Sequence, residues 1–177
     1  MKEDYATVLE YLPNGYPLER KMMPIVQAIG KKNFTLLELV PRRGIGIEVG
    51  EDVYIGEGKR DKVYYILGRL KREKLTEPAK AQLQEIVRLR IKEDEEKIVK
   101  FFNEANAINK RLHLIELIPG MGKKHMQEIL KQREEKPFET FKEMKERIPN
   151  LPDPEKAVEK RILQELTTME KYNLFTQ

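Results

Sequence analysis

The first part of the chain alternates short apolar runs with turn residues, a pattern typical of small β-structures. The apolar runs are Tyr5–Leu12, Ile25–Ile29, Phe34–Val40, Asp52–Ile55 and Val63–Leu67. β-Branched and aromatic residues dominate the last two runs, and such side chains suit a pleated surface. Glycine and proline interrupt the pattern too often for long helices. We therefore predict about five short strands over residues 1–75 that form an OB-like β-barrel; an SH3-like barrel fits the same pattern.

From Thr76 onward the apolar positions recur at helical spacing. Thr76 is a suitable helix cap, and the Glu77-Pro78 pair suits a first helical turn. The apolar residues from Leu83 to Ile91 then fall close to one helical face. A second helix is expected over Glu93–Ile108, because its acidic start suits the positive end of a helix dipole. We therefore predict an α+β multidomain protein, in which an all-α domain over residues 76–177 follows the barrel.

Composition narrows the classes of function. The chain has no cysteine, which excludes a disulfide framework and thiolate metal sites. No run of about 18 residues lacks charge, and the N-terminus has no secretory signal, so we expect a cytoplasmic protein without a membrane partner. The 34 basic and 30 acidic side chains give a net charge of +4. Residues 1–75 hold 14 basic and 11 acidic side chains, so most of the excess lies in the barrel.

The most specific pattern in the chain is Ile118-Pro119-Gly120-Met121-Gly122-Lys123-Lys124. A short apolar helix is expected to end at Pro119, and a second helix to begin after Gly122. The two glycines permit unusual backbone conformations and let a ligand approach the main chain. The free amides at the start of the second helix, together with Lys123 and Lys124, suit a phosphate group. No side chain here suits the reading of base edges, so the predicted contact with a nucleic-acid backbone is largely sequence-independent.

These residues resemble the helix-hairpin-helix family of nucleic-acid-binding motifs. The family pattern is apolar-Pro-Gly-apolar-Gly followed by a later isoleucine, and Ile118–Gly122 and Ile129 match it. The chain departs from the pattern at Met126, where alanine is usual. The resemblance implies a motif over residues 111–133 in which the amides around Gly120, Gly122 and Lys124 hold a phosphate.

A second helix–turn–helix is expected over residues 148–166, after a connecting segment at 137–148. Its turn has three prolines and no glycine, and proline lacks an amide donor. We interpret it as a degenerate hairpin that stabilises the pair without holding phosphate. The whole arrangement is similar to a little-characterised archaeal family of predicted nucleic-acid-binding proteins. That resemblance implies an OB-like barrel joined to a C-terminal helix-hairpin-helix domain.

The barrel offers a second candidate surface. Residues 1–75 contain several pairs of adjacent basic residues, such as Arg42-Arg43, and six of the seven tyrosines. Bases of a single strand stack on aromatic rings while Lys and Arg meet phosphates, so Arg42 and Arg43 are candidate contacts. The alternative interpretation is that tyrosines occur because they favour strands, and that the charged pairs lie in solvated loops. Both interpretations stay open at this point.

The sequence lacks the patterns of two enzyme classes that its first turn and its glycines could suggest. One superfamily of DNA glycosylases places a catalytic aspartate downstream of a similar hairpin, but residues 139–143 contain only Glu139 and Glu143 as acids. No phosphate-binding P-loop pattern is present. We therefore predict a non-enzymatic protein, without metal or cofactor, that binds RNA or DNA. The alternative is a protein–protein adaptor in a nucleic-acid-processing assembly, and protein partners in such an assembly are compatible with both.

Overall fold

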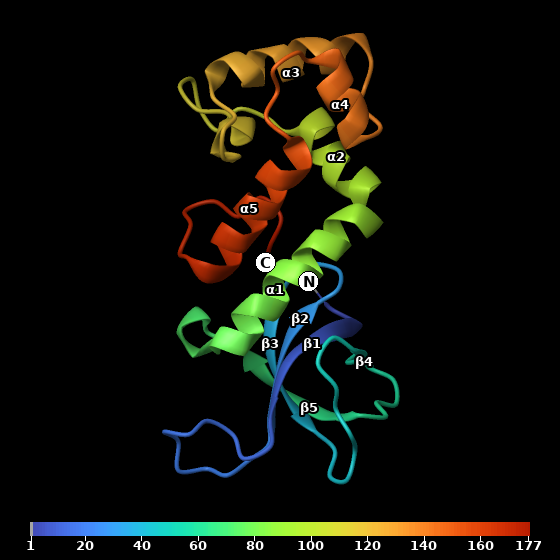
Figure 1. Cartoon of the computed structure of the whole chain (residues 1–177), viewed down its shortest axis with the longest axis vertical. Coiled ribbons are helices and arrows are strands. Elements are labelled where there is room, and N and C mark those ends of the chain that lie inside the picture. Colours follow the sequence, from blue (N-terminus) through green and yellow to red (C-terminus); the bar gives the residue numbers. More distant parts are fainter. Residues whose placement is uncertain (1) are drawn as a thin grey trace. The chain divides into compact units, whose positions relative to one another are not determined.

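The computed structural model describes residues 2–177 and has an α+β fold (Figure 1). The strands are β1 (Tyr5–Leu12), β2 (Ile25–Gly30), β3 (Leu36–Pro41), β4 (Asp52–Tyr54) and β5 (Val63–Arg69). The helices are α1 (Glu77–Glu93), α2 (Glu95–Glu104), α3 (Lys123–Glu135), α4 (Phe141–Arg147) and α5 (Pro154–Thr167). Two short 3₁₀ helices, η1 (Arg72–Lys74) and η2 (Leu114–Leu117), complete the described elements. The predicted change from strands to helices is confirmed.

The predicted end of the second helix was wrong. The helix was expected to continue to Ile108, but α2 ends at Glu104. Beyond it the backbone is extended: Ala107 forms an antiparallel bridge with His113, and the amide of Ile108 donates to the carbonyl of Leu112 over 2.8 Å. These hydrogen bonds across a loop replace the helical ones, and they lead the chain into η2.

By their contacts, the residues form two compact units. The sheet unit comprises the residues up to Ile86 together with Glu165–Gln177, and the helical unit comprises Val87–Gln164. The predicted division into residues 1–75 and 76–177 follows the change from strands to helices, whereas the units divide within α1 and within α5. No helix of residues 2–177 is both long enough and apolar enough to cross a membrane.

The sheet unit is built on a curled, five-stranded antiparallel sheet with the order β4-β1-β2-β3-β5 (Figure 1). The core side chains come from all five strands or the residues next to them: Ala6, Val8, Val26, Ala28, Leu37, Leu39, Val53, Ile55 and Val63. Every residue of the central strand β2 is buried. The sheet therefore encloses an apolar core in the manner of a half-barrel.

Irregular strand pairing produces the curl. On β5, Tyr65 pairs with Val40 and Val63 pairs with Pro41, so Tyr64 is an extra residue without a partner of its own. A second register shift on β5 and one on β1 leave Leu67 and Leu9 as extra residues. Such β-bulges bend a strand and increase its twist, so they allow five short strands to curve around one core.

Buried Gln27 joins β2 to the start of the helical region. Its side-chain amide donates to the carbonyl of Lys74 over 2.7 Å and to the hydroxyl of Tyr16 over 3.2 Å. Its side-chain oxygen accepts from the amide of Thr76 over 3.3 Å, and Gln27 itself is 0 % exposed. The hydroxyl of Thr76 in turn accepts from the amide of Ala79 over 3.2 Å, so the predicted cap of α1 is confirmed. One polar side chain thus fixes the loop after β1 and the beginning of α1.

Replacing Gln27 by leucine should lower the free energy of unfolding by about 2–3 kcal/mol, because the partly buried partners of its side chain lose their hydrogen bonds. Urea denaturation of Gln27→Leu measures the change. Gln84→Leu is the matched control, since Gln84 is exposed on α1, and its free energy of unfolding should stay within about 0.5 kcal/mol of wild type. Equal stabilities of the two variants would contradict the structural role of Gln27.

The helical unit packs around an apolar centre, and arginines bind carbonyl groups near its helix ends. The side chains with at most 2 % exposure include Ile115, Ile118, Met121, Ile129 and Met144. Arg133 donates to the carbonyl of Ala105 over 2.7 Å, just beyond α2. Arg147 donates to the carbonyl of Gln132 near the end of α3, and Arg161 donates to the last carbonyl of η2 over 3.4 Å. The guanidinium groups of these three arginines therefore bind carbonyl groups of the helical unit itself.

Candidate nucleic-acid interface

The turn between η2 and α3 has the backbone geometry that its glycines favour. The amide of Met121 donates to the carbonyl of Ile118 over 3.0 Å, and Gly120 has φ of +81°. This left-handed conformation favours glycine because a Cβ atom makes it strained. Ile118 and Met121, which flank the turn, are 1 % and 2 % exposed. The turn is thus anchored by its apolar residues, while its glycines lie outside.

The first turn of α3 presents main-chain donors to solvent. Gly122 occupies the capping position and supplies no side-chain cap, and a Cβ atom built on it would meet nothing within 4 Å. No acceptor within residues 2–177 receives a hydrogen bond from the backbone amide of Gly122, Lys123 or Lys124. Both lysine side chains are exposed. The predicted residues Pro119, Gly120, Met121, Gly122, Lys123 and Lys124 therefore form one continuous feature with an open approach to these amides.

The turn between α4 and α5 repeats this backbone geometry with different residues. The amide of Leu151 donates to the carbonyl of Ile148 over 3.3 Å, and Asn150 has φ of +63°, matching Gly120. The two turns are neighbours, because a Cβ atom on Gly120 would lie 3.7 Å from Pro152. Asparagine is among the residues that tolerate the left-handed conformation best after glycine. The helical unit thus contains two equivalent turns side by side.

The two turns differ at the helix that follows. The Asp153 carboxylate accepts from the amides of Glu155 over 3.1 Å and Lys156 over 3.4 Å, so α5 begins on its own negative group. At α3 the corresponding start is Gly122, which has no such group. A helix N-terminus favours an anion because of its unsatisfied amides and its dipole. The second turn holds an internal anion, and the first leaves that position open.

Arg42 and Arg43 belong to the other unit, in the loop between β3 and β4. The Arg42 guanidinium donates through Nε to the carbonyl of Arg60 over 2.8 Å and lies 5.9 Å from the ring centre of Tyr64. Arg43 is exposed beside it. The candidate residues therefore form two separate sets, one in each unit.

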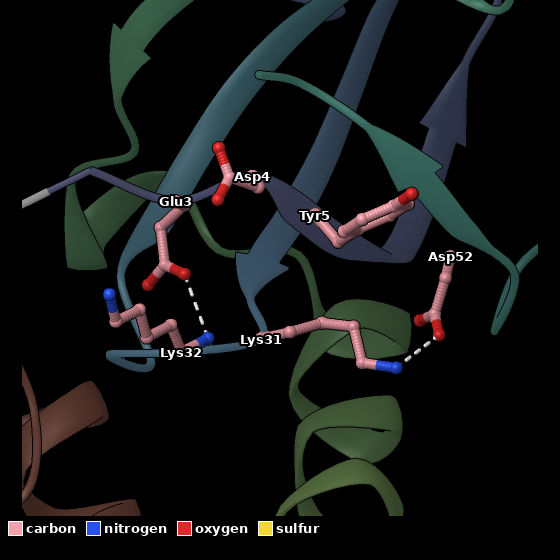
Figure 2. Close-up of a pocket in the computed structure, with 6 residues that line it drawn as sticks. All are labelled: Glu3, Asp4, Tyr5, Lys31, Lys32 and Asp52. Atoms are coloured by element: carbon pink, nitrogen blue, oxygen red, sulfur yellow. Dashed lines mark hydrogen bonds and ion pairs between the residues drawn. The ribbon is translucent and has the colours of Figure 1, made fainter.

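A hollow of about 400 Å³ near the N-terminus was not anticipated from the sequence (Figure 2). The Glu3 carboxylate accepts from the amides of Lys32 over 2.8 Å and Asn33 over 2.7 Å. Lys31 is paired with Asp52 across the same hollow (Figure 2). The Glu3 and Asp52 carboxylates are thus already engaged within the protein, and we assign the hollow a structural role. Within residues 2–177, no group of three or more histidine or acidic side chains is placed to hold a metal ion.

His113 has a capping role that sequence reasoning missed. Its Nδ1 accepts from the amide of Ile115 over 3.1 Å, and the Glu116 carboxylate accepts from the amide of His113 over 2.7 Å. His113 is 5 % exposed. Burial, together with the positive charge of Arg133, lowers the pKa of His113 below its usual 6.5, against the opposing effect of Glu116. Its position three residues before a glutamate was the available signal, and this cap begins the short helix that leads into the first turn.

The free energy of unfolding should fall as the pH decreases below about 6.5, because the unfolded state then binds a proton on residue 113 that the folded state resists. The contribution of neutral His113 is fully present above the unfolded pKa and is lost as the pH falls through the lowered pKa of the folded state. Urea denaturation between about pH 7.5 and pH 5 should show a smaller pH dependence for His113→Asn. His125→Asn is the control, and equal pH dependence of His113→Asn and wild type would contradict this role.

Comparison with known proteins connects the chain to one family along its whole length. The family model described as "Protein of unknown function (DUF655)" matches residues 2–177. The uncharacterized protein MJ0038 of Methanocaldococcus jannaschii is 45% identical over 177 residues, which cover 99% of this chain and 80% of that protein. The crystal structure of Af1531 from Archaeoglobus fulgidus, of the same family designation, has a TM-score of 0.85 and 43% identity, covering 99% of this chain and 100% of that one. These matches confirm the predicted resemblance to a little-characterised family with archaeal members.

Proposed function

The chain belongs to the DUF655 family, and we propose that it is a nucleic-acid-binding protein whose helical unit holds a backbone phosphate at the turn Pro119–Lys124. One observation carries the proposal. Of two equivalent turns, the second closes its helix start with the Asp153 carboxylate, whereas the first leaves three amides open beside two exposed lysines. A phosphate oxygen is an anionic acceptor of the kind that Asp153 supplies internally.

The proposed contact does not depend on nucleotide sequence. Main-chain amides and lysine side chains meet phosphate groups, which are the same at every nucleotide of RNA and DNA. We interpret residues 111–133 as a helix-hairpin-helix motif and residues 148–166 as its degenerate partner. The paired left-handed turns at Gly120 and Asn150 support this interpretation. The strand order, with β1 between β2 and β4 and with β3 beside β5, supports an OB-like sheet unit.

We propose binding without catalysis. DNA glycosylases with a similar hairpin have a catalytic aspartate downstream of it. In this chain, the acids of the corresponding segment are Glu139 and Glu143. Glu143 accepts from the amide of Glu139 over 3.1 Å and is paired with Arg147 over 2.9 Å. The hydrogen bond from the Glu139 amide lowers the pKa of the Glu143 carboxyl most, and the pairing with Arg147 lowers it further. The carboxylate is thus engaged by a main-chain amide and by Arg147 at the start of α4, which is a structural role.

Charge reversal at the first turn should weaken binding. In fluorescence anisotropy at about 50 mM salt, wild type should bind duplex DNA or structured RNA, and its affinity should fall as salt rises. Lys123→Glu/Lys124→Glu should lose affinity by on the order of tenfold or more and reduce the salt slope by about 1 for each lysine. Lys131→Glu/Lys142→Glu carries the same charge change on exposed positions outside the turn and should retain more affinity. If wild type binds none of these probes at low salt, the proposal fails and the protein–protein adaptor is favoured.

A more specific test makes the first turn resemble the second. In Gly122→Asp the new carboxylate would cap α3 as Asp153 caps α5, and the extended φ of −85° and ψ of −169° at this position suit a capping aspartate. The free energy of unfolding should stay unchanged or rise by up to about 1 kcal/mol, while affinity for duplex DNA falls because the anion position is filled. Gly122→Asn tests the cap without the charge. Full affinity in a folded Gly122→Asp protein would remove the first turn from the site.

A further inference from the structure

A groove of about 950 Å³ in the sheet unit combines tyrosine rings with arginines. It lies where the end of β3 and the start of β5 meet the loop before β2, and Tyr11, Met23, Arg42, Arg43, Tyr64 and Tyr65 are among the residues that line it. No acidic residue is among the described residues that line it. The groove therefore has a positive, aromatic character, unlike the N-terminal hollow, where both signs of charge are present.

Because of the β-bulge on β5, two consecutive tyrosine side chains line this groove. In a regular strand, neighbouring side chains point to opposite faces. Here Tyr64 is the extra residue between the pairs Val63–Pro41 and Tyr65–Val40, so both Tyr64 and Tyr65 line the groove. Tyr64 is 62% exposed and Tyr65 is 37% exposed. Two aromatic side chains that a sheet would normally separate are thus presented to solvent on one side.

Further contacts hold these side chains in place without a ligand. The rings of Tyr64 and Tyr65 meet edge to face, with centroids 5.4 Å apart. The hydroxyl of Tyr65 donates to the sulfur of Met23 over 3.5 Å, and Arg42 is fixed by the carbonyl of Arg60. A site whose side chains are already ordered loses less conformational entropy when it binds.

We propose that this groove binds unpaired nucleotides of a single-stranded nucleic acid. Bases stack on Tyr64 and Tyr65, and the backbone phosphates meet Arg42 and Arg43. Charge complementarity selects this occupant: a polyanion with exposed aromatic faces matches two arginines, exposed rings and the absence of acidic lining residues. The inference rests on the proposed function, because it gives the nucleic-acid-binding protein a second contact, in its sheet unit, of a different kind from the phosphate contact at Gly122.

The test separates stacking from phosphate contact. Single strands of about 12 nucleotides, one with bases and one abasic, present the same phosphates to the protein. Tyr64→Leu/Tyr65→Leu should bind the base-bearing strand roughly 5- to 100-fold more weakly, with little change for the abasic strand. Tyr64→Phe/Tyr65→Phe should retain affinity, because it keeps the rings. Arg42→Gln/Arg43→Gln should weaken the binding of both strands.

Two controls keep the result specific to the groove. Tyr5→Leu removes a tyrosine that is 50% exposed but does not line the groove, and it should bind as wild type does. Circular dichroism melting should show that the leucine variants remain folded. The chain has no tryptophan, so quenching of tyrosine fluorescence by the base-bearing strand, reduced in Tyr64→Leu/Tyr65→Leu, reports stacking directly.

The outcomes distinguish this inference from the proposed function. Wild type that binds duplex DNA through Gly122 but shows no preference for the base-bearing strand over the abasic strand overturns the groove assignment alone. Unchanged single-strand affinity in Tyr64→Leu/Tyr65→Leu has the same meaning. Binding of an acidic or proline-rich peptide without binding of the single strand also overturns it. Failure of every nucleic acid to bind at low salt overturns the proposed function, and this inference with it.

Discussion

The pairing of β3 with β5 is the constraint on which the sheet unit depends. Two residues of β5 have no partner on β3, and the resulting bends let a five-stranded sheet close around side chains from all its strands. The same irregularity brings Tyr64 and Tyr65 to one groove. Formation of the core and of the tyrosine-lined groove therefore have a common origin, because a bulge changes both the curvature of a strand and the direction of its side chains.

The helical unit depends on a comparable local constraint, the left-handed residue in each of its two turns. Gly120 and Asn150 let apolar neighbours enter the core while the helix starts stay outside. The unit uses Arg133, Arg147 and Arg161 on its own carbonyl groups. Exposed positive charge beside the first turn therefore comes from lysines. The net charge of +4 comes mainly from residues 1–75, so it does not by itself point to the first turn.

Much of this organisation was predictable from local sequence. The apolar runs at 5–12 and 63–67 predicted strands that the structure contains, because β-branched and aromatic side chains suit a pleated surface. The first turn was located from its glycines, and the chain begins α3 immediately after Gly122. The second turn is harder to recognise in the sequence, because asparagine replaces glycine at position 150. An aspartate followed by proline at a helix start was the available sign that α5 caps itself.

Backbone dihedral preferences and helix caps depend on residues only a few positions apart. The strand-rich and helix-rich parts, the first turn and the cap at Thr76 could therefore be predicted from the sequence. Three features required the folded chain: the end of α2 at Glu104, the lowered pKa of buried His113, and the groove bordered by Tyr11, Arg42 and Tyr64. Those features depend on pairing and burial between distant segments. A single inserted residue in a strand reverses which side chains share a face, and no glycine or proline lies directly beside Tyr64 to mark the insertion there.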